Sequence, residues 1–302
     1  MHCDTLALIT AKDGALFKND GHFDIERAQL SNLWVQFFAL FTMPTDANIA
    51  LKNVLLQMEK FHTELEINRD YLYLIKNFTD IDNNSHKIGA ILHLEGAEAI
   101  GRDIETLSLL YRLGLRSLGL TWNYRNFLAD GVAEGQADGG LTNFGKQVIK
   151  EMDRLGIMMD LSHVGSRSFF EAFDYYNKPI MITHANAYAI CPHRRNLTDE
   201  QLKVLADNDG IIGINQVDFF LNETANAGIN DLLAHIKYIA DTIGVRYIAL
   251  GSDFDGADKI VMSGVEEYNR WEGILAGAGF IDDEISQILN KNALRVVSQI
   301  LT

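Results

Sequence analysis

Short apolar stretches rich in β-branched and aromatic residues alternate with longer amphipathic segments along the chain, and this alternation limits the possible folds more than any other feature. The apolar stretches lie at 33–41, 87–96, 116–123, 156–163, 179–185, 210–216 and 247–256. The segments between them place apolar residues at helical spacing, and several begin with Asp, Asn or Thr and end with Gly. A strand–helix unit repeated in this way predicts a parallel sheet whose strands are joined by helices.

The length of the chain and its lack of linkers indicate a single domain. The chain has 302 residues and only three prolines, and no Ser/Gly-rich or low-complexity stretch divides it. If MHCDTLALIT, residues 1–10, supplies the end of a first strand, eight strand candidates are present. We therefore expect one (β/α)8 TIM barrel over residues 1–302, with the last helices, 265–279 and 282–301, closing the barrel or packing against it.

Charge and hydropathy exclude several classes of function. The net charge is -15, whereas nucleic-acid binding depends on clustered Lys and Arg, so we expect no nucleic-acid partner. The chain has no run of about 18 apolar residues and no basic amino-terminal region followed by an apolar stretch, so we expect a cytoplasmic protein without membrane association. The two cysteines, Cys3 and Cys191, are too few for a disulfide framework, and we expect both to be reduced thiols.

The barrel also predicts where the chemistry lies, because the active sites of such folds are built at the carboxyl ends of the strands. The polar residues that end or follow the predicted strands are His2, Asp4, Glu95, Trp122, Asn123, His163, His184, Asn215, Gln216, Asp253 and Asp255. Each alone has a simpler interpretation: a histidine after an apolar run is more often a core or capping residue, and LEG or DFDG is a strand followed by a turn. Together, imidazoles and carboxylates at one rim are costly in desolvation and repulsion without a cation among them, which favours a divalent metal.

The spacing of His2 and Asp4 indicates how such a metal is held. Residues two apart in an extended strand point to the same face, so both side chains reach one ion while the residue between them points away. Imidazole and carboxylate are ligands for zinc, manganese or iron. The set contains no thiolate, which would have favoured a closed structural zinc site. Glu95, from a neighbouring strand, is placed to bridge to a second ion that His163 and His184 hold.

The order and spacing of several blocks resemble the membrane dipeptidase (renal dipeptidase) family of binuclear zinc metallopeptidases. The resemblance covers nearly the whole chain, and its strongest single block runs from His184 to Asn196. The matching blocks are HCDT at 2–5, VQFFALF at 35–41, LEG at 94–96, LGLRSLGLTWN at 113–123, ADG at 129–131, GLTNFGKQVIKEMDRLGIMMDLSHV at 140–164, THANAYAICPHRRNLTDEQL at 183–202 and ALGSDFDG at 249–256.

The resemblance implies a barrel of the metal-dependent hydrolase type with two divalent ions per chain, expected to be Zn²⁺. It implies that His2 and Asp4 hold one ion and that Glu95 bridges the two. By the same resemblance, His163 and His184 hold the second ion.

The resemblance also implies a substrate and a reaction. Arg195 matches the family arginine that binds the substrate's carboxylate, and Asp253 matches the acidic residue that handles protons during cleavage. A planar guanidinium suits bidentate recognition of a carboxylate, and a dipeptide carries a free carboxylate close to its scissile bond. We therefore expect hydrolysis of dipeptides by a hydroxide between the two ions, with Glu95 and Asp253 as the catalytic carboxylates. Without the resemblance, Arg195 would be assigned to the surface or to a helix cap. The competing interpretation of Asp253 is a turn carboxylate, although Asp255 is better placed for that role.

The chain departs from the family pattern at three points. Only Met1 precedes His2, so we expect either that the true start lies upstream of this numbering or that the first strand is very short and the first metal site is held less firmly. Trp122 stands where mammalian relatives have a histidine implicated in substrate binding, so we expect Trp122 and Asn123 to reshape the substrate pocket. Mammalian relatives are lipid-anchored, whereas these residues include no hydrophobic carboxyl tail, so we expect a protein that resembles the soluble bacterial members. A homodimer is the assembly that the resemblance implies.

Two other hypotheses remain at this stage. The first is another metal-dependent barrel enzyme of the amidohydrolase type, acting on a cyclic amide or deaminating a base. Many of those enzymes have HxH on the first strand and a modified lysine as the bridge, whereas this chain has HxD and Glu95. The second is a metal-binding barrel with impaired catalysis, which the short first strand favours and the presence of Arg195 and Asp253 opposes.

Overall fold

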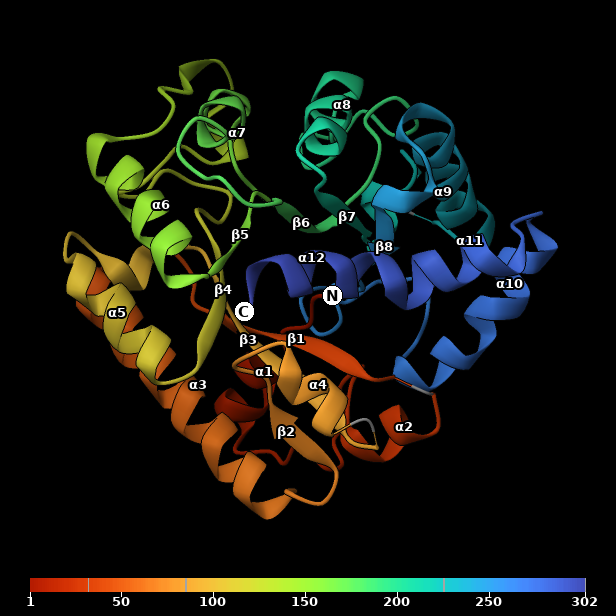
Figure 1. The fold of residues 1–302 in the computed structure, drawn as a ribbon, viewed down its shortest axis with the longest axis horizontal. Coiled ribbons are helices and arrows are strands. Elements are labelled where there is room, and N and C mark those ends of the chain that lie inside the picture. Colours follow the sequence, from red (N-terminus) through yellow and green to blue (C-terminus); the bar gives the residue numbers. More distant parts are fainter. Residues whose placement is uncertain (32, 85, 225, 302) are drawn as a thin grey trace.

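The computed structural model describes residues 1–31, 33–84, 86–224 and 226–301, and a curled parallel sheet forms its centre (Figure 1). Neighbouring strands in the sheet follow the order β1-β3-β4-β5-β6-β7-β8. Their bounds are β1 Val35–Phe41, β3 Ile88–Glu95, β4 Leu115–Gly119, β5 Met158–Asp160, β6 Met181–Ala185, β7 Ile211–Ile214 and β8 Ile248–Leu250. These strands lie within the seven apolar stretches predicted from the sequence, except that β4 begins one residue earlier, so that part of the fold prediction is confirmed.

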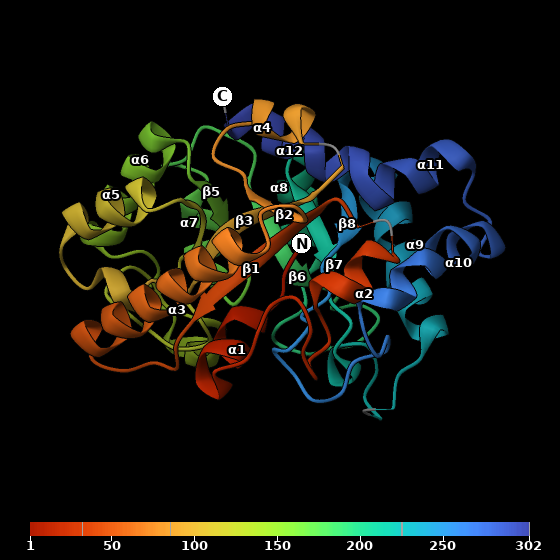
Figure 2. The ribbon, with the colours of Figure 1, turned by 90° about the horizontal axis from the view of Figure 1, so that it is seen from below.

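Helices surround the strands on the outside of the sheet (Figures 1 and 2). Their bounds are α1 Thr5–Lys12, α2 Ile25–Gln29, α3 Ala47–Ile67, α4 Thr79–Asn83, α5 Ile104–Arg112, α6 Asn143–Leu155, α7 Ser166–Ala172, α8 Asp199–Asp207, α9 Ile229–Ile243, α10 Trp271–Gly277, α11 Asp282–Ser286 and α12 Asn292–Ile300. The predicted boundary signals operate as expected: the Thr142 hydroxyl caps α6 by accepting from the Gly145 N–H, and Gly156 ends it in the left-handed conformation.

The start of the chain differs from the prediction, in which residues 1–10 supply the end of a first strand. Only Cys3 pairs as a strand residue, with Phe38 on one side and Phe254 on the other. The Cys3 N–H donates to the Phe37 carbonyl at 3.2 Å, and the Asp4 N–H donates to the Phe254 carbonyl at 2.7 Å. The following residues, predicted to belong to the strand end, form helix α1 instead.

A short strand that the sequence analysis did not predict, β2 (Leu72–Leu74), pairs in parallel with β3 outside the main strand order. Its three residues are too few to produce a recognisable alternation. The observed architecture is therefore an α/β fold with a curled parallel sheet. Among the described residues, no helix combines the length and apolar character needed to cross a bilayer.

Successive residues of each strand face opposite sides of the sheet, and this alternation produces two apolar clusters. Phe38 and Leu92 belong to the larger cluster, which includes residues of the surrounding helices. Phe37 and Ile91 belong to a smaller cluster, which also holds Val296, Val297 and Ile300 of α12, together with Met158, Met181, Ile211 and Ala249 from other strands. Figure 1 shows α12 lying across the middle of the ring of strands. Helix α12 thus covers one end of the curled sheet, and the other end is left for the polar residues that end the strands.

Candidate metal centre

The predicted metal ligands come from segments far apart in the sequence that meet at one end of the sheet. His2 and Asp4 flank Cys3, whose thiol lies on the opposite side, 3.5 Å from the Phe37 carbonyl oxygen. Glu95 is the last residue of β3, and His184 lies in β6. His163 follows β5, and Asp253 follows β8.

The side chains of these residues converge around the Glu95 carboxylate. His2 Nε2 lies 3.2 Å from Asp4 Oδ2 and 3.4 Å from Glu95 Oε2. The other oxygen, Glu95 Oε1, lies 3.0 Å from His163 Nε2 and 3.6 Å from His184 Nε2. Glu95 therefore faces the His2–Asp4 pair with one oxygen and the histidine pair with the other, which is the geometry of a bridging carboxylate.

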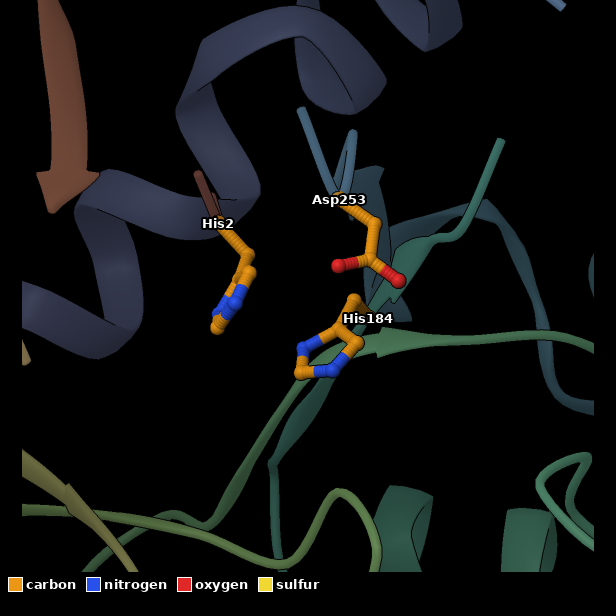
Figure 3. A group of neighbouring side chains, drawn as sticks. All are labelled: His2, His184 and Asp253. Carbon is orange, nitrogen blue, oxygen red and sulfur yellow. The ribbon is translucent and has the colours of Figure 1, made fainter. Parts of the chain in front are cut away.

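Three overlapping sets of side chains have donor atoms within 4.8 Å of one another, and every member is buried. The sets are His2, Asp4 and Glu95; Glu95, His163 and His184; and His2, His184 and Asp253. Figure 3 shows the side chains of the third set pointing toward a common centre. Buried imidazoles and carboxylates without thiolates form a donor set suited to zinc or another divalent transition metal.

Two buried atoms support this assignment because they lack a hydrogen-bond partner among the described residues. These are His2 Nδ1 and Asp4 Oδ1. A buried polar atom without a partner is costly, and a bound cation would remove that cost for the carboxylate oxygen. The residues present thus fit a divalent metal.

Burial sets the protonation of the centre. Desolvation, with the nearby Asp4 charge, raises the pKa of Glu95 to about 8, and desolvation also raises the pKa of Asp253. Burial lowers the pKa values of His163 and His184 well below the ordinary value, so both imidazoles are neutral and have lone pairs available for a metal. Burial opposes protonation of His2 as well, but the Glu95 and Asp4 carboxylates raise its pKa well above 6.5.

Backbone strain marks the loops that present two of these residues. His163 has φ 67° and Asp253 has φ 66°, a left-handed conformation that residues with a side chain rarely adopt. Each such residue costs of order 1 kcal/mol, and such strain clusters at functional sites. The turns after β5 and β8 therefore direct both side chains into the centre at a cost in stability.

The whole chain, residues 1–302, matches the family model described as membrane dipeptidase, peptidase family M19. This chain belongs to the membrane dipeptidase family. Over 93% of its length it is 29% identical to the dipeptidase aclJ of Aspergillus oryzae and covers 70% of that protein. It is similar to the crystal structure of dipeptidase AC, a metallopeptidase of family M19, with 27% identity and a TM-score of 0.92 over 99% of this chain and 97% of the other. It is also similar to a metallopeptidase from Rhodobacter sphaeroides liganded with a phosphinate mimic of the dipeptide L-Ala-D-Ala, with 26% identity, a TM-score of 0.92 and the same coverage.

The predicted substrate residues of this family member line a cavity of about 420 Å³ that also contains Asp4, Glu95, His163 and Asp253. Arg195 is only 4% exposed, and one of its terminal nitrogens donates to the His184 carbonyl at 3.1 Å. Its Nε has no partner among the described residues. The guanidinium thus borders the cavity with a donor still available.

Trp122 and Asn123 lie on the cavity wall, and Asn123 also contacts a metal-ligand candidate. Asn123 Oδ1 lies 2.9 Å from His163 Nδ1, so it orients that imidazole. The Trp122 ring packs near Phe41 at 5.5 Å and near His163 at 6.0 Å between ring centroids. Trp122 is therefore a wall of the cavity beside the histidine pair.

Asp253 has a position that the sequence analysis did not anticipate. It was predicted to handle protons, yet its carboxylate also lies within ligand distance of His2 and His184. Asn215 Nδ2 donates to Asp253 Oδ2 at 2.8 Å and fixes the carboxylate. Asp255 belongs to none of the three ligand sets; it borders the cavity, and its carboxylate accepts from the Thr5 hydroxyl at 2.6 Å.

Several residues near the centre were missed from the sequence. His193, Phe219 and Phe220 line the same cavity. Asp160 and Thr183 lie close to the histidine pair, and their sequence signal was available, since Asp160 stands in DLSH and Thr183 directly precedes His184. The two were overlooked because they lie within the predicted strands rather than at the strand ends that were searched.

Proposed function

We propose that this member of the membrane dipeptidase family hydrolyses the peptide bond of dipeptides that carry a free C-terminal carboxylate. The observation that carries the proposal is the position of Glu95, which faces the His2–Asp4 pair with one oxygen and His163 and His184 with the other. Arg195 borders the same cavity and supplies a cation for the substrate's carboxylate. The complex of the R. sphaeroides relative with a dipeptide mimic supports this choice of substrate.

Two Zn²⁺ ions per chain are the proposed cofactor, with His2 and Asp4 on one ion, His163 and His184 on the other, and Glu95 shared. When bound, such ions supply Lewis acidity that activates water near neutral pH and polarises the scissile carbonyl. The neutral imidazoles of His163 and His184 need lose no proton to act as ligands. Glu95, whose pKa is about 8, must lose its proton on binding.

The remaining residues bind and orient the substrate. Arg195 binds the terminal carboxylate, and because that charge lies at a fixed distance from the last peptide bond, it places that bond for cleavage. Asp253 holds a proton at its carboxylate and transfers it to the departing amine, a role consistent with its raised pKa. Trp122 excludes water from one side of the cavity, and Asn123 holds His163 in place.

We also propose that residues 2–4 act as the first strand of a closed (β/α)8 barrel and that residues 1–302 form one domain. The pairing of Cys3 with both Phe38 and Phe254 supports closure, because it joins the two edges of the curled sheet through one residue. Pairing on both sides also fixes His2 and Asp4, which opposes the expectation of a loosely held first metal site.

The test is to measure zinc content and hydrolysis of L-L and L-D dipeptides for the wild type, for His163→Ala and for the control His62→Ala. His62 is a histidine of α3 outside the centre, where its Nε2 lies 3.0 Å from the Leu113 carbonyl oxygen. We expect about two zinc ions and turnover in the wild type and the control, and loss of turnover in His163→Ala. Fully zinc-loaded wild-type protein that cleaves no dipeptide would overturn the proposal.

A further inference from the structure

A layer of polar side chains is buried inside the curled sheet, next to the metal centre. It consists of His93, Ser117, Asp160, Ser162 and Thr183, none of which is more than 2% exposed. His93 lies two residues before Glu95 on β3 and two after Ile91, so its level in the sheet is between the centre and the apolar cluster that includes α12. A polar layer at this depth is costly unless its groups are paired, so its contacts are informative.

Asp160 is the central acceptor of this layer, and donors surround it. Its Oδ1 accepts from the Ser162 N–H at 2.9 Å, the Ser162 hydroxyl at 2.8 Å and the Thr183 N–H at 3.0 Å. Its Oδ2 accepts from the Thr183 hydroxyl at 2.5 Å. Four donors hold the carboxylate in one orientation, so Asp160 is a rigid acceptor.

The direction of these hydrogen bonds fixes the protonation of His184. The Thr183 hydroxyl has one proton, and its hydrogen bond to Asp160 Oδ2 uses that proton. Thr183 Oγ1 also lies 2.8 Å from His184 Nδ1, and with its own proton used it must accept there. His184 therefore carries its proton on Nδ1 and turns the Nε2 lone pair toward Glu95 and His163.

We propose that Asp160 and Thr183 are positioning residues that hold His184 in the tautomer and orientation that a metal requires. Ser162 completes the arrangement, because its hydroxyl donates to Asp160 and accepts from the His184 N–H at 3.3 Å. Asp160 thus holds the His184 ring through Thr183 and the His184 backbone N–H through Ser162. This role rests on the metal site of the proposed function, but the tautomer itself is a property of the metal-free chain.

The consequence for metal binding follows from which nitrogen is free. Histidine ligands commonly donate their second ring N–H to a fixed acceptor, and removing that acceptor weakens metal binding by about 10- to 100-fold. At His163 the corresponding acceptor is the neutral Asn123 amide, whereas at His184 it is a hydroxyl backed by a carboxylate. We therefore expect removal of the Thr183 hydroxyl to weaken zinc binding by about 10- to 100-fold.

The first experiment measures zinc affinity by competition with a chromophoric chelator for Thr183→Val and Thr183→Ser. Valine has nearly the shape of threonine but no hydroxyl, and serine restores the hydroxyl. The control is Ser168→Ala, which removes a different buried hydroxyl, the one that accepts from the Asp130 N–H at 3.2 Å. We expect weaker zinc binding in Thr183→Val, and binding close to that of the wild type in Thr183→Ser and the control.

The second experiment reads the tautomer directly in the zinc-free protein by ¹⁵N NMR of the histidine rings, in the wild type and in Asp160→Asn. The asparagine amide donates to Thr183, so the threonine proton turns to His184 Nδ1 and the ring proton moves to Nε2. We expect His184 to be protonated at Nδ1 in the wild type and at Nε2 in the variant.

Wild-type His184 protonated at Nε2, or wild-type zinc affinity in Thr183→Val, would overturn the inference. Equal impairment of the valine and serine variants would also overturn it, because packing rather than the hydroxyl would then decide. A wild type that binds no zinc but has His184 protonated at Nδ1 would contradict the proposed function and leave the tautomer assignment supported.

Discussion

Replacing Glu95 with glutamine is expected to stabilise the metal-free protein and to weaken the zinc-loaded one. Glu95 is 5% exposed, and burial raises its pKa from 4.5 to about 8. The folded metal-free protein therefore binds a proton that the unfolded chain releases above pH 4.5. Stability associated with Glu95 is complete below pH 4.5 and is lost as the pH rises toward 8.

The size of the effect follows from the pKa. At pH 7, burying Glu95, which takes up a proton on folding, costs about 3 kcal/mol; above pH 8 the carboxylate is buried as the anion and the cost approaches about 5 kcal/mol. Glutamine has nearly the same shape and no charge, so metal-free Glu95→Gln avoids the cost. With zinc the order reverses, because the wild type gains about 2.7 kcal/mol for each site at a zinc concentration 100 times the Kd, and glutamine is a poor bridging ligand.

The assay is urea unfolding followed by circular dichroism at pH 5, 7 and 8.5, with EDTA or with zinc. The control is Glu98→Gln, which replaces another buried glutamate whose pKa burial raises but which lies outside the three ligand sets. The control should share the stabilisation without metal and keep the response to zinc. Metal-free Glu95→Gln that is no more stable than the wild type at pH 8.5 would refute the view that Glu95 is a desolvated carboxylate.

Three further predictions concern substrate binding, acid stability and the core. Arg195→Lys should lower kcat/KM for dipeptides by about 10- to 100-fold with unchanged zinc content, because lysine cannot bind a carboxylate bidentately. Steady-state kinetics and zinc analysis test this, and an unchanged kcat/KM in the zinc-loaded variant would contradict it. Burial lowers the pKa of His93 to about 4, so the free energy of unfolding of the metal-free protein should fall by up to about 3 kcal/mol as the pH falls from 6.5 to 4. Unfolding curves of His93→Gln should lack this loss. The same pH dependence in the variant and the wild type would contradict the prediction. Phe38→Ala should cost about 3–5 kcal/mol, because Phe38 is fully buried against Phe23 with ring centroids 5.1 Å apart; a loss below about 1 kcal/mol in urea unfolding would show that the site collapses.

Much of the fold could be predicted because its signals are local. Apolar runs between amphipathic segments identified every strand of the main sheet apart from the single pairing at Cys3, and the caps at Thr142 and Gly156 bounded α6. Strand β2 was missed because three residues carry no periodicity. The first helix was assigned to a strand because the four residues LALI are all apolar and such a short run fits a strand or a helix equally well.

For the candidate site, too, the sequence predicted the features that depend on local spacing and missed those that depend on tertiary structure. The spacing of His2 and Asp4 predicted that their side chains lie on the same face of a strand. The positions of Glu95, His163 and His184 at strand ends indicated that they are candidate ligands. The sequence could not show that Asp253 lies within ligand distance of His2 and His184, because strand curvature and turn conformation set that distance.

The sequence by itself determined the order of strands and helices, the chemical identity of the donor atoms and the family. Only the tertiary structure decided which oxygen of Glu95 faces which histidine, and that Asp160 reaches His184 through Thr183. The physical reason is the range of the interactions. Periodicity and capping act over a few residues, whereas hydrogen-bond direction and burial depend on atoms brought within about 3 Å by the curling of the whole sheet.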